Sequence, residues 1–78
     1  MEGDRCEYCN GTIRERILER EVFKHRAGFV ILENPRVGVC DRCGHRYYGA
    51  ALLRQVHALA TGEVPPERQI SVPVARAG

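Results

Sequence analysis

The sequence has few of the side chains that build a large hydrophobic core. It contains no tryptophan, one methionine, two phenylalanines and three tyrosines among its 78 residues. A chain of this length buries only about 60% of the surface that its unfolded form exposes, so we expect a thin core. Domains this small usually need a further stabilising element, such as a metal ion or disulfides. The sequence therefore predicts one small domain with such an element and excludes a second domain of ordinary size.

Long hydrophobic runs are also missing, and we expect no secretory leader. The longest apolar runs, residues 29–32 and 50–53, are far shorter than the roughly 20 residues that cross a bilayer. Residues 1–5 have neither the basic start nor the apolar stretch of a secretory signal. We therefore expect a soluble, cytoplasmic protein without a membrane partner. In that reducing compartment cysteine thiols stay unpaired, which favours metal binding over disulfides.

Side chains for catalysis are scarce. Ser71 is the only serine, and the three histidines, His25, His45 and His57, lie in no recognisable general-base motif. Cysteines that bind a metal are not free to act as nucleophiles. The sequence therefore predicts that the protein is not an enzyme.

Charge of one sign is not in excess. The chain has 12 Lys and Arg against 10 Asp and Glu, a formal net charge of +2. Four cysteine thiolates with one Zn²⁺ would bring the loaded protein close to neutral, because metal-bound cysteines are deprotonated. A nucleic-acid-binding domain normally carries a clear basic excess on one face. Overall charge therefore gives nucleic-acid binding no support.

Four cysteines carry the strongest pattern in the chain. They form two C-x2-C pairs separated by thirty residues, and glycine follows each pair closely, at Gly11 and Gly44; the cysteines are Cys6, Cys9, Cys40 and Cys43. Two residues between cysteines allow a tight turn to direct both sulfurs at one ion, and two such turns supply a tetrahedral sulfur set for Zn²⁺. We expect both glycines to adopt positive φ after the second sulfur. The pattern predicts one zinc ion bound by all four cysteines in two zinc knuckles.

Other readings of the cysteines remain open. Two disulfides would require an oxidising compartment, and a thioredoxin-like pair needs only one C-x-x-C. Iron in a rubredoxin-like site has the same geometry as zinc, so the sequence does not separate the two metals. With four cysteine ligands the site has no open position, which makes the metal structural rather than catalytic. We expect folding to depend on it.

The residues after the second cysteine pair predict a helix over 49–60. Leu52, Val56 and Leu59 repeat at helical spacing and form an apolar stripe. Gly62 and the proline pair at 65–66 mark its end. Such a short helix is unstable alone, so its stripe must pack on the segment between the cysteine pairs.

The segment between the cysteine pairs predicts strands, with one ambiguity. Residues 12–24 suit either a helix or a strand, because their apolar residues fit neither pattern cleanly, although a helix would place like charges four residues apart. Residues 29–32 suit a buried strand, with turns at 25–28 and 34–35 on either side. We expect a small α+β zinc-bound domain with about three antiparallel strands between the knuckles and one C-terminal helix.

The last residues predict a separate, strand-like tail. We place the zinc-binding domain at 1–62 and a Pro-rich linker and tail at 63–78. Residues 68–78 alternate apolar and other side chains, and Pro73 confines such a strand to a sheet edge. An apolar strand here either folds back on its own sheet or adds to the edge of another chain.

These features resemble the YgiT-type zinc-finger family, the zinc-binding half of MqsA-like antitoxins. The resemblance covers residues 6 to about 62. It rests on the two cysteine pairs with their glycines, the wide gap, an aromatic at Tyr47 or Tyr48 and the single helix, and the tail also looks like the endings of small stand-alone members. It implies a structural zinc on Cys6, Cys9, Cys40 and Cys43.

The resemblance also implies a function. In MqsA-like proteins this domain binds an mRNA-cleaving toxin, and a separate helix-turn-helix domain, which these 78 residues do not contain, binds operator DNA. We therefore expect the antitoxin component of a type II toxin-antitoxin pair, whose partner is a small toxin encoded nearby. The alternative is a zinc ribbon that contacts nucleic acid through a basic stretch of five residues: Arg14, Arg16, Arg20, Lys24 and Arg26.

Overall fold

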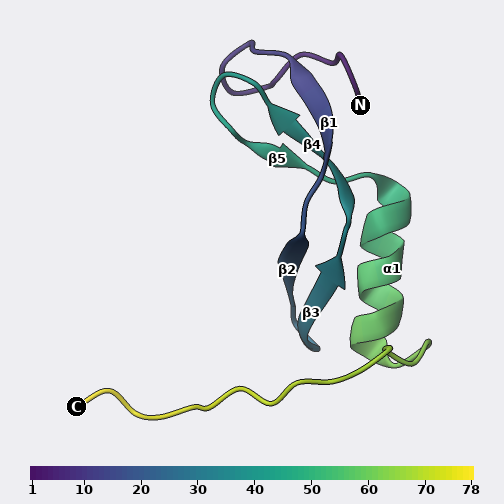
Figure 1. The fold of residues 1–78 in the computed structure, drawn as a ribbon, viewed down its shortest axis with the longest axis vertical. Helices are drawn as coiled ribbons and strands as arrows, with labels where there is room; N and C mark the ends of the chain where they lie inside the picture. Colours follow the sequence, from purple (N-terminus) through teal and green to yellow (C-terminus); the bar gives the residue numbers. More distant parts are fainter.

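Five strands and one helix follow one another along the chain. The computed structural model describes residues 1–78 and contains β1 (Ile13–Ile17), β2 (Arg20–His25), β3 (Gly28–Glu33), β4 (Arg36–Cys40), β5 (Arg46–Tyr47) and α1 (Ala50–Thr61). Strands β1, β4 and β5 form one antiparallel sheet in the order β1-β4-β5, and β2 and β3 form a second. Helix α1 packs against this second sheet (Figure 1). The fold is thus the small α+β arrangement that the sequence predicts.

The two sheets are consecutive parts of one long β-hairpin. Strand β1 pairs with β4 and β2 pairs with β3 in the same register. Between them the Leu18 amide donates to the Pro35 carbonyl at 3.1 Å, and the Asn34 amide donates to the Glu19 carbonyl at 3.0 Å. Pro35 has no N–H to donate in return, and Asn34 has a left-handed φ of 56°. These two residues interrupt the ladder and divide the hairpin into two sheets.

The strand count differs from the expected three. Four strands lie between the cysteine pairs, because residues 12–24 form two strands, β1 and β2, with a bend at Glu19. The helical reading of this segment is therefore wrong. A helix would have set Arg16 beside Arg20 and Glu15 beside Glu19, whereas the strands with a bend between them keep these like charges apart.

Helix α1 confirms the sequence prediction to within one residue at each end. Gly62 ends it with a left-handed φ of 82°, and its amide turns back to the carbonyls of Ala58 and Leu59. Val56 is the buried residue of the apolar stripe. No helix in the structure has both the length and the hydrophobicity to cross a membrane.

The core is thin and consists of two clusters. Only ten of the 78 residues are buried. The cluster under the helix contains Phe23, Val30, Leu32 and Val56, and the cluster at the other end contains Cys6, Ile13 and Cys40. Two of the three residues in the second cluster are cysteines, so that end of the molecule depends on what the sulfurs bind.

The tail, residues 63–78, forms neither helix nor strand. The strand expected at its end is absent, because the tail pairs with no strand of its own chain and lacks the hydrogen bonds that an extended segment needs. The Arg68 guanidinium contacts the Glu33 carboxylate at 2.7 Å. Beyond this ion pair the tail leads away from the domain, with Ile70, Val72 and Val74 exposed (Figure 1).

Candidate metal centre

Two turns of nearly the same geometry hold the cysteines. The first spans residues 6–11 and the second residues 40–45. In each turn the amide of the fifth residue donates to the carbonyl of the first cysteine, at 3.1 and 3.0 Å, and the amide of that cysteine donates to the carbonyl of the sixth residue, at 2.8 and 2.9 Å. Because β1 and β4 are paired, the hairpin places the two turns side by side.

Asn10 and Gly44 make these turns possible. They occupy the same position, directly after the second cysteine, and both have left-handed backbone, with φ of 63° and 77°. Asn and Gly are the residues that adopt this conformation most readily. The prediction of positive φ is therefore correct for Gly44 and wrong for Gly11, since Asn10 takes that role in the first turn.

Gly11 is required for a different reason. A Cβ atom at this position would lie 2.7 Å from the Cys40 sulfur and 2.8 Å from the Cβ of Arg42. Glycine thus permits the backbone of the first turn to approach a sulfur of the second. This close approach allows the sulfurs of both turns to lie close together.

The four sulfurs form one cluster. All four lie within 4.8 Å of one another, with 3.7 Å between the sulfurs of Cys6 and Cys43 and 3.3 Å between those of Cys9 and Cys40. The cysteines are free rather than bonded to each other. A Zn–S bond of about 2.3 Å places the sulfurs of a tetrahedral site about 3.8 Å apart. The cluster therefore has the size that a single metal ion in a four-thiolate site requires.

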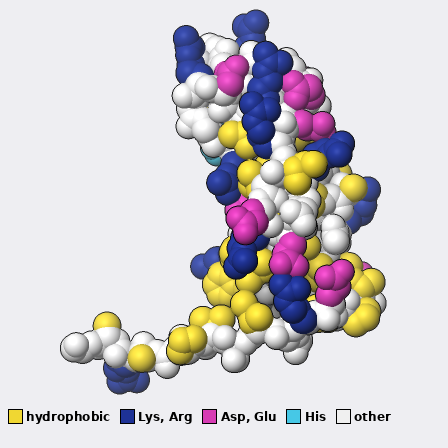
Figure 2. Space-filling model, in the orientation of Figure 1, with side chains coloured by type: hydrophobic (Ala, Val, Ile, Leu, Met, Phe, Trp, Pro, Cys, Tyr) yellow, Lys and Arg dark blue, Asp and Glu magenta, His cyan; other side chains and the backbone are white.

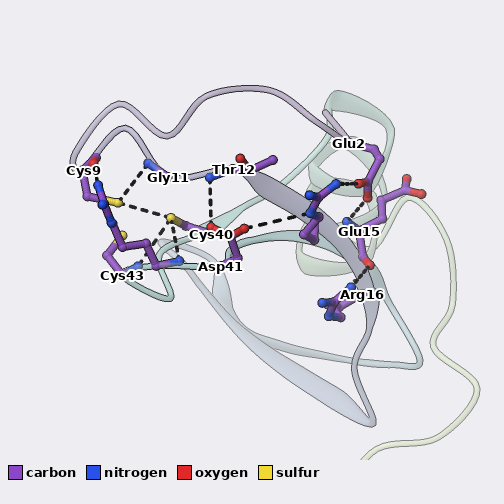
Figure 3. A network of polar contacts seen from close by, with 11 residues as sticks. Glu2, Cys9, Gly11, Thr12, Glu15, Arg16, Cys40, Asp41 and Cys43 are labelled. Carbon is purple, nitrogen blue, oxygen red and sulfur yellow. Dashed lines mark hydrogen bonds and ion pairs between the residues drawn. The ribbon is translucent and has the colours of Figure 1, made fainter.

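Backbone amides point at two of the sulfurs. The Cys40 sulfur accepts from the amides of Arg42 and Cys43, each at 3.4 Å, and the Cys9 sulfur accepts from the amide of Gly11 at 3.4 Å (Figure 3). Hydrogen bonds from amides favour the charged thiolate. Those of Cys43 and Arg42 hold the pKa of Cys40 below its ordinary value, against the opposing effect of burial.

Tyr47 supports the centre from β5. Its hydroxyl lies 3.2 Å from the Cys6 sulfur and accepts a hydrogen bond from the Glu7 amide at 3.1 Å. The hydrogen bond from Tyr47 lowers the pKa of Cys6 to about 6, despite burial. Tyr47 thus favours the thiolate form of Cys6, which is the form that binds a metal.

Cys9 shows why the cluster favours a cation. The Gly11 amide lowers the pKa of Cys9, but the hydrogen bond with Cys40, burial and the two other cysteines outweigh it and raise that pKa to about 12. Four thiols at this spacing cannot all ionise beside one another without a positive charge among them. A divalent metal ion supplies that charge.

Polar side chains connect the two turns at the surface. The Asp41 carboxylate accepts from the Thr12 amide at 3.0 Å, and the Arg14 guanidinium lies 4.0 Å from the same carboxylate (Figure 3). Arg42 of the second turn donates to the carbonyl of Cys9 in the first at 3.1 Å. These contacts hold the turns in register around the sulfurs.

The four cysteines named from the sequence come together, whereas the histidines stay apart from them. His45 packs against the rings of Tyr8 and Tyr47, at centroid distances of 4.4 and 5.0 Å. His25 at the end of β2 and His57 of α1 face each other, with 3.1 Å between Nε2 of His25 and Nδ1 of His57. Sequence analysis named an aromatic at Tyr47 or Tyr48 only for the family resemblance and assigned it no contact with a sulfur, because the contact with Cys6 spans 41 residues.

No family model, curated protein or solved structure matches the chain. The resemblance to the YgiT-type family therefore rests on the sequence motifs alone. The structure itself contributes a cluster of four cysteine sulfurs sized for one metal ion.

Proposed function

We propose that this protein is a zinc-stabilised protein-binding module, the antitoxin of a type II pair, which neutralises a small ribonuclease-type toxin by direct contact. The sulfur cluster supports a structural zinc, because four cysteine ligands fill the coordination shell of Zn²⁺ and leave no position for substrate. The YgiT-type resemblance supports a toxin as the partner. A binding role, rather than catalysis, agrees with a chain whose thiols are all in the cluster.

One observation carries the binding role: an apolar surface on the side of the β2–β3 hairpin away from the helix. We call it the outer face, and it consists of Val22, Phe29 and Ile31. They are 55%, 73% and 40% exposed. Val22 lies opposite Ile31 in the register, so these side chains are adjacent. A contiguous exposed apolar patch on so small a domain is typical of a protein-interaction surface.

The experiment is native purification of the metal-loaded chain from its host, with the wild-type sequence compared with Phe29→Lys. We expect one zinc per chain and a small basic protein at equal stoichiometry with the wild type. The charged side chain in Phe29→Lys should abolish binding of that partner and leave the zinc content unchanged. Leu53→Lys is the matched control, because Leu53 is 47% exposed and lies on helix α1.

Two results would contradict the antitoxin proposal. The first is a wild-type protein that carries zinc but no protein partner. The second is a partner that is equally well retained by Phe29→Lys, which would place the contact elsewhere than on the outer face.

Nucleic-acid binding is the second candidate function, and the free cations favour it. Of the five basic side chains from Arg14 to Arg26, only Arg14 has a carboxylate within 4.0 Å, supplied by Glu2 and Asp41. Figure 2 shows Lys and Arg side chains along much of one face, but Asp and Glu lie among them. Salt separates the candidates, because phosphate contacts weaken steeply as salt rises and an apolar protein contact does not.

A further inference from the structure

Strand β3 has an open edge. It pairs only with β2. The two-residue turn at 26–27 places His25 opposite Gly28 in the hydrogen-bonded pair that closes the hairpin, and bonded and non-bonded pairs alternate from there along the antiparallel ladder. The backbone groups of Phe29, Ile31 and Glu33 therefore point away from β2. None of the backbone hydrogen bonds outside the helix and the strands involves these three residues.

A groove lies along this edge. Its volume is about 670 Å³, and its lining includes residues 29–33 of β3, Gln55 and Leu59 of α1, and residues 64–70 of the tail. One wall of the groove is thus the first part of the chain's own tail. Residues 71–78 take no part in the lining. An extended segment that pairs with β3 in this groove lies between β3 and the wall formed by residues 64–70.

The end of the tail has the pattern of such a segment. Ile70, Val72 and Val74 alternate with other side chains and are 62%, 69% and 93% exposed. Pro73 has no N–H, so its position in a strand must face away from a pairing partner. Backbone groups alternate from side to side along a strand, so Val72 and Val74 then face the partner. Their β-branched side chains favour a strand.

We infer that the tail of one copy adds as an edge strand to β3 of a second copy, and that the exchange is reciprocal. The same chain carries both the open edge and a strand that fits it, which is the condition for a two-fold symmetric exchange. In each copy residues 64–70 wall the groove, and the following residues lead away from their own domain (Figure 1). The occupant of each groove is therefore the tail of the other copy.

The exchange extends the outer face. Val72 of one copy lies beside Phe29 and Ile31 of the other. Apolar side chains that are exposed in the single chain therefore cover each other in the dimer. Main-chain hydrogen bonds to β3 supply the remaining stabilisation. This inference does not depend on the proposed function, because the purified chain alone forms the dimer.

The test is the oligomeric state of the metal-loaded full chain, measured by sedimentation across a dilution series. We expect a dimer for the wild type. Val72→Pro removes an amide that faces β3 and should raise the dimer Kd at least about tenfold, the effect of roughly one lost buried hydrogen bond. Ala75→Pro is the matched control, since position 75 faces away from β3 like Pro73. Both residues are exposed and lie in no helix or strand, so both variants should fold.

A mixture of two variants gives a second readout. Phe29→Lys prevents the groove from accepting a tail but leaves its own tail able to pair. Val72→Pro prevents its own tail from pairing but leaves the groove able to accept one. Each should be monomeric alone, and the mixture should form a heterodimer through one exchanged tail. The inference is overturned by a wild-type monomer, by a dimer that Val72→Pro leaves intact, or by an Ala75→Pro variant that dimerises as weakly as Val72→Pro.

Discussion

At the scale of single residues, Cys40 joins the metal centre to the core. Its side chain is 2% exposed and packs in one cluster with Cys6 and Ile13. Its sulfur accepts two backbone amides of the second turn. The same atom therefore takes part in the sulfur cluster, in turn formation and in core packing.

Substitution of this residue should remove the metal and the fold together. We expect Cys40→Ser to lower zinc affinity by at least about a hundredfold, because a neutral hydroxyl replaces a thiolate ligand. Competition with a chromophoric chelator measures the affinity, and circular dichroism measures the fold. His45→Ala is the control and should bind zinc as the wild type does. A Cys40→Ser protein with wild-type zinc affinity would exclude Cys40 as a ligand.

Tyr47 offers a test of the support that surrounds the sulfurs. Tyr47→Phe removes only the hydroxyl that contacts Cys6 and Glu7. Loss of such a supporting contact typically costs 10- to 100-fold in metal affinity, so we expect about a tenfold loss with the fold retained. The same competition titration measures it.

Tyr8→Phe is the matched control for Tyr47→Phe. Tyr8 is 68% exposed, and its ring packs against His45 rather than against a sulfur. Equal zinc affinities for the two variants would show that the Tyr47 hydroxyl plays no part in metal binding.

The sequence predicts the four cysteines of the cluster but not their surroundings. The four cysteines follow from spacing, because C-x2-C turns are local structures. The roles of Tyr47 and Gly11 arise only when the hairpin brings residues about 30 to 40 positions apart into contact. Asn10 was predictable in principle, since it occupies the position of Gly44 in the first turn and Asn is the other residue that favours left-handed backbone.

At the scale of secondary-structure elements, Glu21 connects the β2–β3 hairpin to the segment that leads into α1. Its carboxylate accepts from the Arg46 guanidinium at 2.6 and 2.7 Å and from the Tyr48 hydroxyl at 2.8 Å. Burial acts against ionisation of Glu21, but Arg46 and Tyr48 outweigh it and hold its pKa below the ordinary value. The charged carboxylate thus links β2 with β5 and the start of the helix.

Glu21→Gln should therefore destabilise the fold by about 1–3 kcal/mol, the usual cost of losing hydrogen bonds to a charged group that is largely buried. Chemical denaturation of the zinc-loaded protein measures it. Glu15→Gln is the control: the Glu15 carboxylate lies 4.0 Å from Arg36 and is 44% exposed, so its loss should cost no more than about 0.5 kcal/mol. An equal loss of unfolding free energy in the two variants would contradict a linking role for Glu21.

The helix was more predictable than the strands. Helix α1 carries its own signals, an apolar stripe and a terminal glycine, within 12 residues. The division of 12–24 into β1 and β2 depends instead on Asn34 and Pro35, which lie on the opposite side of the hairpin. The tail has a strand pattern but pairs with no strand of its own chain, so its pattern alone did not determine its structure.

At the scale of the whole molecule, stability should depend on the metal. The helical cluster contains only four buried residues, and the other cluster is built largely from cysteines. A 12-residue helix does not persist alone in water. We therefore expect a chelator to unfold both ends together, with loss of circular dichroism and of NMR signal dispersion that returns when zinc is added. A metal-free chain that keeps a dispersed spectrum would contradict this dependence.

The most direct test of the account is the mass of the purified chain under native and denaturing conditions, with elemental analysis of the same sample. One zinc ion on four cysteines predicts a native mass that exceeds the mass of the protein by one zinc ion per chain, and a denatured chain with four free thiols. A folded chain without metal, a chain bearing iron, or a chain lighter by the hydrogens lost in two disulfides would contradict it.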